Sequence, residues 1–178
     1  MTLLTCFEPF GGDDTNYSSL SSDLIAPDDK LDRILLPVCY RECYEKLREK
    51  LREKEYDNVI LLGQAAGRSR VTIEKIGINW MSATIADNSG LLAHGEKLAK
   101  DGPDGIFTRV DVTGLVDTLR VEGLDVDVSY SAGTFVCNAL YYQTLLENPE
   151  RNVLFIHVPA KDPENSASII ERVIDQLS

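Results

Sequence analysis

Metal-binding patterns are sparse in this sequence. Its 178 residues include two histidines and four cysteines, and neither a CxxC nor an HExxH motif occurs. Because a structural zinc site needs a dense set of such ligands, we expect no bound metal. The cysteines stand at the irregular positions 6, 39, 43 and 137, and a chain of this length does not need disulfides for stability. We therefore expect reduced thiols.

Basic charge and long apolar runs are also scarce. Lys and Arg number 18 against 29 Asp and Glu, which gives a net charge of −11, and the pI is near 4.6. This charge opposes binding to nucleic acid and to anionic membrane surfaces, so we expect neither partner. The first residues lack a basic segment followed by an apolar one, and no later run approaches bilayer length. The sequence therefore predicts a cytoplasmic location.

The remaining composition is that of an ordinary globular protein. Hydrophobic residues make up 43% and charged residues 26%, without internal repeats or low-complexity tracts. A chain of this size buries about two-thirds of its unfolded surface in one core. We expect a single domain over residues 1–178.

Apolar β-type runs alternate with amphipathic helical patterns along the chain. This order predicts an α/β fold, a three-layer α/β/α sandwich around a twisted, mostly parallel mixed sheet. The expected strands are 2–7, 31–38, 59–63, 71–79, 126–131 and 153–158. Helices are expected near 16–25, 39–54, 114–122, 135–146 and 165–177, with an antiparallel extension over 80–85 and an exposed flap over 91–105. Asn16 or Ser18, Thr113, and Asn165 or Ser166 are the expected helix caps.

Three groups of residues follow expected strands of this sheet. They are the glycine-containing loop 63–69, the segment 131–137 and His157. Sites in doubly wound sheets gather beyond the carboxyl ends of the strands. We therefore expect these groups to converge at one edge.

Cys137 and His157 are the candidate chemical pair. Cys137 lies where the β-type run gives way to a helix, and unpaired N–H groups at a helix start favour the thiolate. His157 ends a buried strand and is a candidate base. Both residues are alternatively ordinary core residues, because cysteine and strand-end histidine are often simply buried.

Five segments together resemble one family, the cysteine peptidases called pyroglutamyl peptidase I. They read Thr-Cys-Phe-Glu-Pro-Phe-Gly-Gly at 5–12, Gly-Gln-Ala-Ala-Gly-Arg-Ser at 63–69, Ile-Glu-Lys-Ile-Gly-Ile-Asn at 73–79, Ser-Ala-Gly-Thr-Phe-Val-Cys-Asn at 131–138 and Phe-Ile-His-Val-Pro at 155–159. The resemblance implies the same α/β/α sandwich. It also implies Cys137 as the nucleophile, His157 as general base and acid, and Glu74 as the carboxylate that orients the imidazole. On the residues alone, Glu74 is expected to be a solvated strand carboxylate or a partner of Lys75 or Arg68.

The substrate implied by the resemblance is a peptide with an N-terminal pyroglutamyl residue, cleaved without metal or organic cofactor. Its neutral lactam ring suits an apolar pocket with few polar contacts, for which Phe7, Phe10 and Phe135 have the right chemistry. The resemblance places Phe7 and Phe10 around the ring, with Ile85, Asp87 and the backbone of Phe135 and Val136 near it. It also implies a homotetramer or dimer.

One departure from the family pattern concerns the oxyanion. Positions 83–88, usually Ala-Arg-Ile-Pro-Asp-Asn, read Ala-Thr-Ile-Ala-Asp-Asn, so Thr84 stands where the family has an oxyanion-binding arginine. Losing one such donor costs about a hundred- to thousand-fold in turnover. Arg68 is a candidate replacement, or else ties its loop to a carbonyl or carboxylate. The alternative function is a divergent member with weak or no peptidase activity that binds or hydrolyses another small lactam or amide.

Overall fold

The computed structural model describes all residues, 1–178, and confirms the α/β class. Five helices cover a central sheet. They are α1 (Tyr17–Leu24), α2 (Glu42–Glu53), α3 (Val112–Val121), α4 (Val136–Glu147) and α5 (Pro163–Leu177). The strands are β1 (Thr2–Phe7), β2 (Leu31–Leu36), β3 (Asn58–Gln64), β4 (Val71–Glu74), β5 (Ile76–Ile78), β6 (Met81–Ser82), β7 (His94–Glu96), β8 (Gly105–Phe107), β9 (Val126–Ser129) and β10 (Asn152–Val158).

The central sheet is mixed, in the order β2-β1-β3-β10-β4-β9. All its neighbours pair in parallel except β10 and β4, which are antiparallel. The strands β4 and β9 therefore run opposite to the other four. The carboxyl ends of β3 and β10 lie at the expected edge, whereas β9 runs the other way. The chain after Ser129 therefore has to turn back, and in this way residues 132–137 still join Gln64 and His157 as expected.

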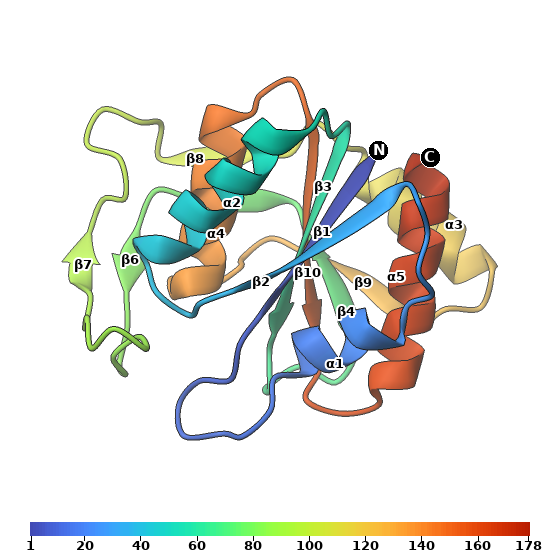
Figure 1. The fold of residues 1–178 in the computed structure, drawn as a ribbon, viewed down its shortest axis with the longest axis horizontal. Helices are drawn as coiled ribbons and strands as arrows, with labels where there is room; N and C mark the ends of the chain where they lie inside the picture. The colour runs from blue at the N-terminus through green and yellow to red at the C-terminus, as the bar shows by residue number, and fades with distance from the viewer.

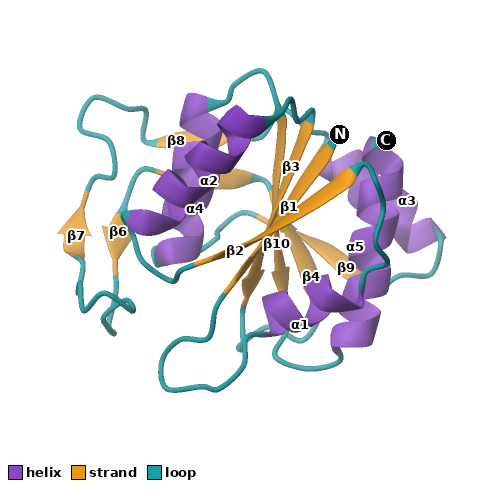
Figure 2. Cartoon of the chain, viewed as in Figure 1, coloured by secondary structure: helices purple, strands orange, loops and turns teal.

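Two apolar cores lie on the two faces of this sheet. Side chains alternate along the central strands, so that Leu61 and Phe155 join one core while Ile60 and Ile156 join the other. The helices α2 and α4 complete the first core, and α3 and α5 complete the second. Figure 1 and Figure 2 show α2 and α4 on one side of the sheet, with α1, α3 and α5 on the other.

The expected strand 71–79 is divided at Lys75. Its first half, β4, belongs to the central sheet, whereas β5 pairs with β8 in a separate ribbon. The expected flap 91–105 is partly ordered as strand, because β7 pairs with β6. These short ribbons lie beside α4, away from the central sheet (Figure 1).

Helix capping follows the sequence only in part. The side chain of Asn16 accepts a hydrogen bond from Ser18 N–H, as expected for the cap of α1. Thr113 is not the cap of α3, because the side chain of Asp111, two residues earlier, accepts from Gly114 N–H. Asp162, in a left-handed conformation with φ 47°, caps α5 in place of Asn165 or Ser166. In both corrected cases a carboxylate, a stronger acceptor for first-turn N–H groups, lies upstream of the expected residue.

Candidate active site

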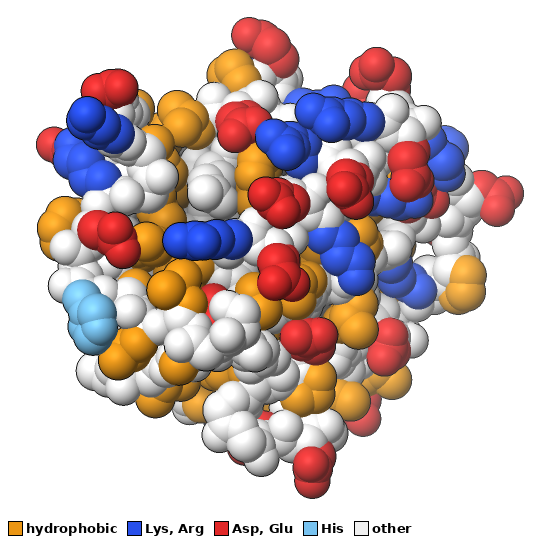
Figure 3. Space-filling view, turned by 60° about the vertical axis from the view of Figure 1, so that its left-hand side comes forward, with side chains coloured by type: hydrophobic (Ala, Val, Ile, Leu, Met, Phe, Trp, Pro, Cys, Tyr) orange, Lys and Arg blue, Asp and Glu red, His pale blue; other side chains and the backbone are white.

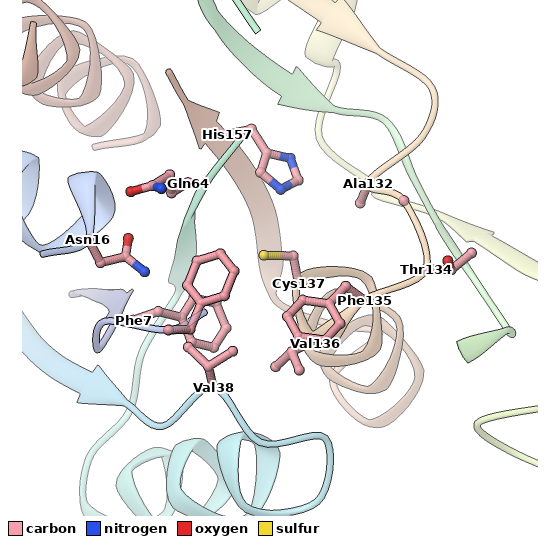
Figure 4. A pocket seen from close by; sticks show the side chains of 12 residues that line it. Phe7, Asn16, Val38, Gln64, Ala132, Thr134, Phe135, Val136, Cys137 and His157 are labelled. Carbon is pink, nitrogen blue, oxygen red and sulfur yellow. The ribbon is translucent and has the colours of Figure 1, made fainter. Parts of the chain in front are cut away.

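A cavity of about 170 Å³ lies where the carboxyl ends of β1 and β3 meet the start of α4. Figure 4 shows its lining side chains facing one another across the space. Seven of the twelve are hydrophobic, so the cavity is apolar with a few polar groups. The lining residues are Phe7, Phe10, Asn16, Val38, Gln64, Ala132, Gly133, Thr134, Phe135, Val136, Cys137 and His157.

Cys137 and His157 are brought together by strand register. Gly63 of β3 pairs with His157 of β10, so both positions face the α4 side of the sheet, where Phe155 also packs. Cys137 is the second residue of α4, and its Sγ lies against Gly63, 2.8 Å from where a Cβ would stand. The absence of that Cβ gives the thiol its place beside the histidine (Figure 4).

The start of α4 leaves backbone donors free at the cavity. No side chain caps this helix, and the N–H groups of Val136, Cys137 and Asn138 have no acceptor within the chain. Together with the helix dipole they favour negative charge at this point.

Glu74 lies behind His157. The antiparallel pairing sets Glu74 opposite Phe155 and Thr72 opposite His157, so Glu74 and His157 are diagonal neighbours. The Nδ1 atom of His157 is 2.8 Å from Oε1 of Glu74, which is fully buried. Because a carboxylate only accepts, Nδ1 carries the proton and Nε2 is the unprotonated nitrogen of the neutral ring. Figure 4 shows the imidazole of His157 and the thiol of Cys137 facing each other.

Arg68 and Tyr141 fix Glu74 in turn. Arg68 Nη1 donates to Oε1 of Glu74 at 2.6 Å and also contacts Thr72, while its Nη2 donates to the carbonyl of Ser131 at 2.9 Å. The hydroxyl of Tyr141 donates to the backbone carbonyl of Glu74 at 2.9 Å. Arg68 therefore ties its loop to a carboxylate and a carbonyl, and it does not line the cavity.

These contacts determine the charge state of the three groups. Burial raises the pKa of Glu74, but the hydrogen bond from His157 and the nearby Arg68 charge outweigh it and hold that pKa below its usual value. Burial lowers the pKa of His157, more than the bond to Glu74 raises it. At neutral pH the resting site contains an ionised Glu74 and a neutral imidazole.

The thiol departs from expectation. Burial, and then the nearby Glu74 carboxylate, raise the pKa of Cys137 to about 12, and Arg68 opposes this shift only in part. The expectation that the helix start favours the thiolate is not met, because loss of hydration and a negative neighbour raise this pKa. The resting pair is a neutral thiol beside a neutral imidazole.

The residues expected to bind substrate fall into two sets. Phe7, Phe10, Phe135 and Val136 line the cavity, with the rings of Phe10 and Phe135 6.0 Å apart. Ile85 and Asp87 do not line it.

Asp87 has a different environment from the one expected. Its carboxylate accepts hydrogen bonds from the backbone N–H groups of Tyr40, Ser89 and Leu91 and from the Ser89 hydroxyl. These four hydrogen bonds make the carboxylate the anchor of the turn 87–91. Ile85, two residues before Asp87, is exposed.

Sequence reasoning missed several lining residues, above all Gln64. It follows the buried run of β3, and its Oε1 accepts from the backbone N–H of Tyr17 at 2.8 Å. That bond leaves its amide nitrogen as a donor at the cavity. A polar residue at the end of an apolar strand was the available signal. Asn16, expected only as a cap, also lines the cavity.

An α/β sandwich in which a cysteine, a histidine and a buried carboxylate meet beyond the strand ends has the composition of a thiol hydrolase. The family model described as pyroglutamyl peptidase matches residues 1–173. A pyrrolidone-carboxylate peptidase of Thermosipho melanesiensis is 36% identical over 165 residues, 88% of this chain and 81% of the relative. One from Thermococcus onnurineus is 35% identical over 185 residues, 97% of this chain and 92% of the relative.

Solved structures agree with this family. The pyrrolidone carboxyl peptidase of Thermus thermophilus superposes with a TM-score of 0.92 at 28% identity, covering 98% of this chain and 99% of that one. That of Fervidobacterium islandicum gives 0.91 at 28% identity, covering 99% and 97%. The chain belongs to the pyroglutamyl peptidase family of cysteine peptidases.

No three His, Cys, Asp or Glu side chains lie together in an arrangement that could hold a metal ion. None of the helices has the length and apolar character needed to cross a bilayer.

The close approach at Gly63 gives a first prediction. In Gly63→Ala the new methyl group would meet Cys137 Sγ and the Phe155 ring at 2.8 Å, so we expect about 1–3 kcal/mol of destabilisation from overpacking. Gly67→Ala is the matched control, because nothing lies within 4 Å of its Cβ position. Urea denaturation measures both. Equal unfolding free energies for the two variants would show that Gly63 is not in close contact with the thiol.

The charge state of Cys137 gives a second prediction. Its raised pKa, about 12, means that the thiolate fraction rises about tenfold per pH unit through the neutral and mildly alkaline range. We expect the iodoacetamide alkylation rate at Cys137 to rise with that slope from about pH 7 to 10, measured by peptide mass spectrometry. A cysteine-containing model peptide, with an ordinary pKa near 8.5, is the control and levels off earlier. If the alkylation rate of Cys137 levelled off at a lower pH than that of the peptide, the neutral-thiol assignment would be contradicted.

Proposed function

We propose that this protein hydrolyses the amide bond after an N-terminal pyroglutamyl residue through an acyl-enzyme on Cys137. The observation that carries the proposal is the placement of Cys137 Sγ at the uncapped start of α4, beside a histidine whose Nδ1 is bonded to buried Glu74. Family membership supports the same reaction.

His157 is the proposed general base and acid. As Cys137 Sγ attacks the scissile carbonyl, its proton passes to Nε2 of His157, and the carbonyl becomes a tetrahedral oxyanion. The imidazolium then protonates the departing amine, and the carbon–nitrogen bond breaks. Water attacks the thioester with His157 again as base, which releases pyroglutamate and restores the thiol.

Glu74 is the proposed positioning residue of this cycle. By accepting from Nδ1–H it holds the ring with Nε2 toward the thiol, and its charge stabilises the transient imidazolium. The neutral resting pair fits this role, because the proton moves only as the attack proceeds.

The free N–H groups of Val136, Cys137 and Asn138 are the proposed oxyanion donors. Backbone donors in a water-poor site stabilise developing negative charge without reorganisation. They supply this stabilisation without the family arginine, whose position holds Thr84. Thr84 itself is exposed outside the cavity, and Arg68 is engaged with Glu74 and Ser131.

The cavity is the proposed pocket for the pyroglutamyl ring, with Phe7, Phe10, Phe135 and Val136 around it. At about 170 Å³ it is smaller than pockets for drug-sized ligands, which fits one small ring. Gln64 offers its amide N–H to the ring carbonyl. An N-terminal ammonium would lose its hydration there without a carboxylate to pair with, so a cyclised N-terminus is preferred. Ile85 and Asp87 act from outside this pocket, with Asp87 fixing the neighbouring turn.

We also propose a single domain over residues 1–178 and a cytoplasmic location, as expected from the size and composition of the chain. The resemblance implies two further properties, N-terminally pyroglutamylated peptides as partners and assembly into a homotetramer or dimer.

Hydrolysis of pyroglutamyl aminomethylcoumarin under reducing conditions tests the proposal. We expect cleavage of this amide and none of the prolyl analogue. Cys137→Ser should abolish it, and His157→Ala should lower kcat/KM about a hundred- to ten-thousand-fold. His94→Ala, which changes the exposed second histidine in β7, is the matched control and should retain activity.

Activity that survives Cys137→Ser would overturn the acyl-enzyme assignment. A silent parent whose activity appears in Thr84→Arg would favour the divergent reading, because the backbone donors would then be insufficient on their own.

A further inference from the structure

A second hollow, here called the outer cleft, adjoins the catalytic cavity. It measures about 420 Å³ and is lined by Ser82, Ala83, Thr84, Ile85, Thr134 and Phe135. Two of these residues, Thr134 and Phe135, also line the cavity. The two spaces therefore adjoin at the short segment that leads into α4 and Cys137.

We propose that the outer cleft binds an uncharged, preferably apolar side chain of the residue that follows pyroglutamate in the substrate. This inference rests on the proposed function. When the ring is in the cavity and the scissile carbon is next to Cys137 Sγ, the residue that follows pyroglutamate has to lie outside the cavity. The outer cleft adjoins the cavity through shared lining residues, whereas the hollow lined by residues 67–70 shares none with it.

The walls of the outer cleft are fixed to each other by hydrogen bonds. The hydroxyl of Thr134 donates to the carbonyl of Ser82 at 2.7 Å, and Ser82 N–H donates to the carbonyl of Thr134 at 3.1 Å. Tyr40 donates to the same Thr134 carbonyl at 3.1 Å. The cleft is therefore a preformed feature, held on the same segment that positions the nucleophile.

The chemistry of the lining determines which side chain fits. None of the six residues is charged, and Ile85, which is 48% exposed, lines the cleft together with Phe135. An apolar side chain gains by covering this surface, while a charged one loses hydration without a partner. Figure 3 brings forward the side of the molecule that carries β6 and β7, where hydrophobic and uncharged side chains predominate at lower left and charged ones gather above.

The backbone beside the outer cleft can also hold a peptide. Neither the N–H nor the carbonyl groups of Thr84 and Ile85 make a hydrogen bond within the chain. Exposed, unpaired main-chain groups of this kind bind the main chain of an extended ligand. These backbone groups can bind any peptide, and the side chains that line the cleft select which residue follows pyroglutamate.

The test compares pyroglutamyl-X-amides with X as Gly, Leu, Glu or Lys, following pyroglutamate release by chromatography. We expect the parent to prefer Leu over Glu, and Ile85→Ala to lower the Leu-to-Gly ratio of kcat/KM about five- to tenfold. Thr84→Glu should raise the Lys-to-Leu ratio about tenfold or more through the new charge. Val121→Glu, at an 89% exposed position on α3, is the matched control and should leave all ratios unchanged.

This experiment distinguishes failure of the outer-cleft proposal from failure of the proposed function. Ratios that stay at parent values in both Ile85→Ala and Thr84→Glu, with substrates still cleaved, would overturn the outer-cleft assignment and leave the proposed function intact. No cleavage of any pyroglutamyl amide by the parent would overturn the proposed function itself. Thermal unfolding of each variant shows whether a lost activity reflects lost folding.

Discussion

The hydrogen bond between Glu74 and His157 is the interaction on which the site depends. A carboxylate with no exposed surface is costly to bury unless it is paired, and removal of one partner from a buried ion pair costs about 3–5 kcal/mol. Here Oε1 of Glu74 receives both His157 Nδ1 and Arg68 Nη1, while Oε2 has no partner. Both donors thus meet the same oxygen atom, the one that orients the imidazole.

That bond exists because one strand reverses direction. If β4 ran parallel to β10, Glu74 would follow Thr72 toward the same edge as Val158; in the antiparallel pairing it lies beside Phe155, one diagonal step from His157. Because β9 is parallel to β4, it also runs opposite to β10, and residues 130–135 have to lead the chain back to the start of α4. Arg68 secures this return by bonding the carbonyl of Ser131, and it thereby links the position of Glu74 to that of the nucleophile.

Much of the fold could be predicted from local patterns. Buried apolar runs gave β1, β3 and β10, and amphipathic spacing gave α2, because these signals depend on burial of one element against its neighbours. The direction of β4 could not be predicted, since strand polarity depends on non-local pairing.

The site was predictable to a different degree. Cys137, His157 and Glu74 do come together, but only the resemblance singled out Glu74. Two features needed the full three-dimensional environment. The raised pKa of Cys137 arises from burial and from a carboxylate 63 positions earlier in the sequence, and the anchoring role of Asp87 arises from donors in two separate segments.

The most direct test of this account is the steady-state activity of Glu74→Gln toward a pyroglutamyl amide. Glutamine keeps the size of the side chain but removes the charge that fixes Nδ1–H and stabilises the imidazolium. We expect kcat/KM to fall about a thousand- to ten-thousand-fold. The exposed Glu53→Gln should match the parent, and circular dichroism should show that both variants are folded. A Glu74→Gln enzyme within threefold of the parent would contradict the claim that this buried carboxylate organises the site.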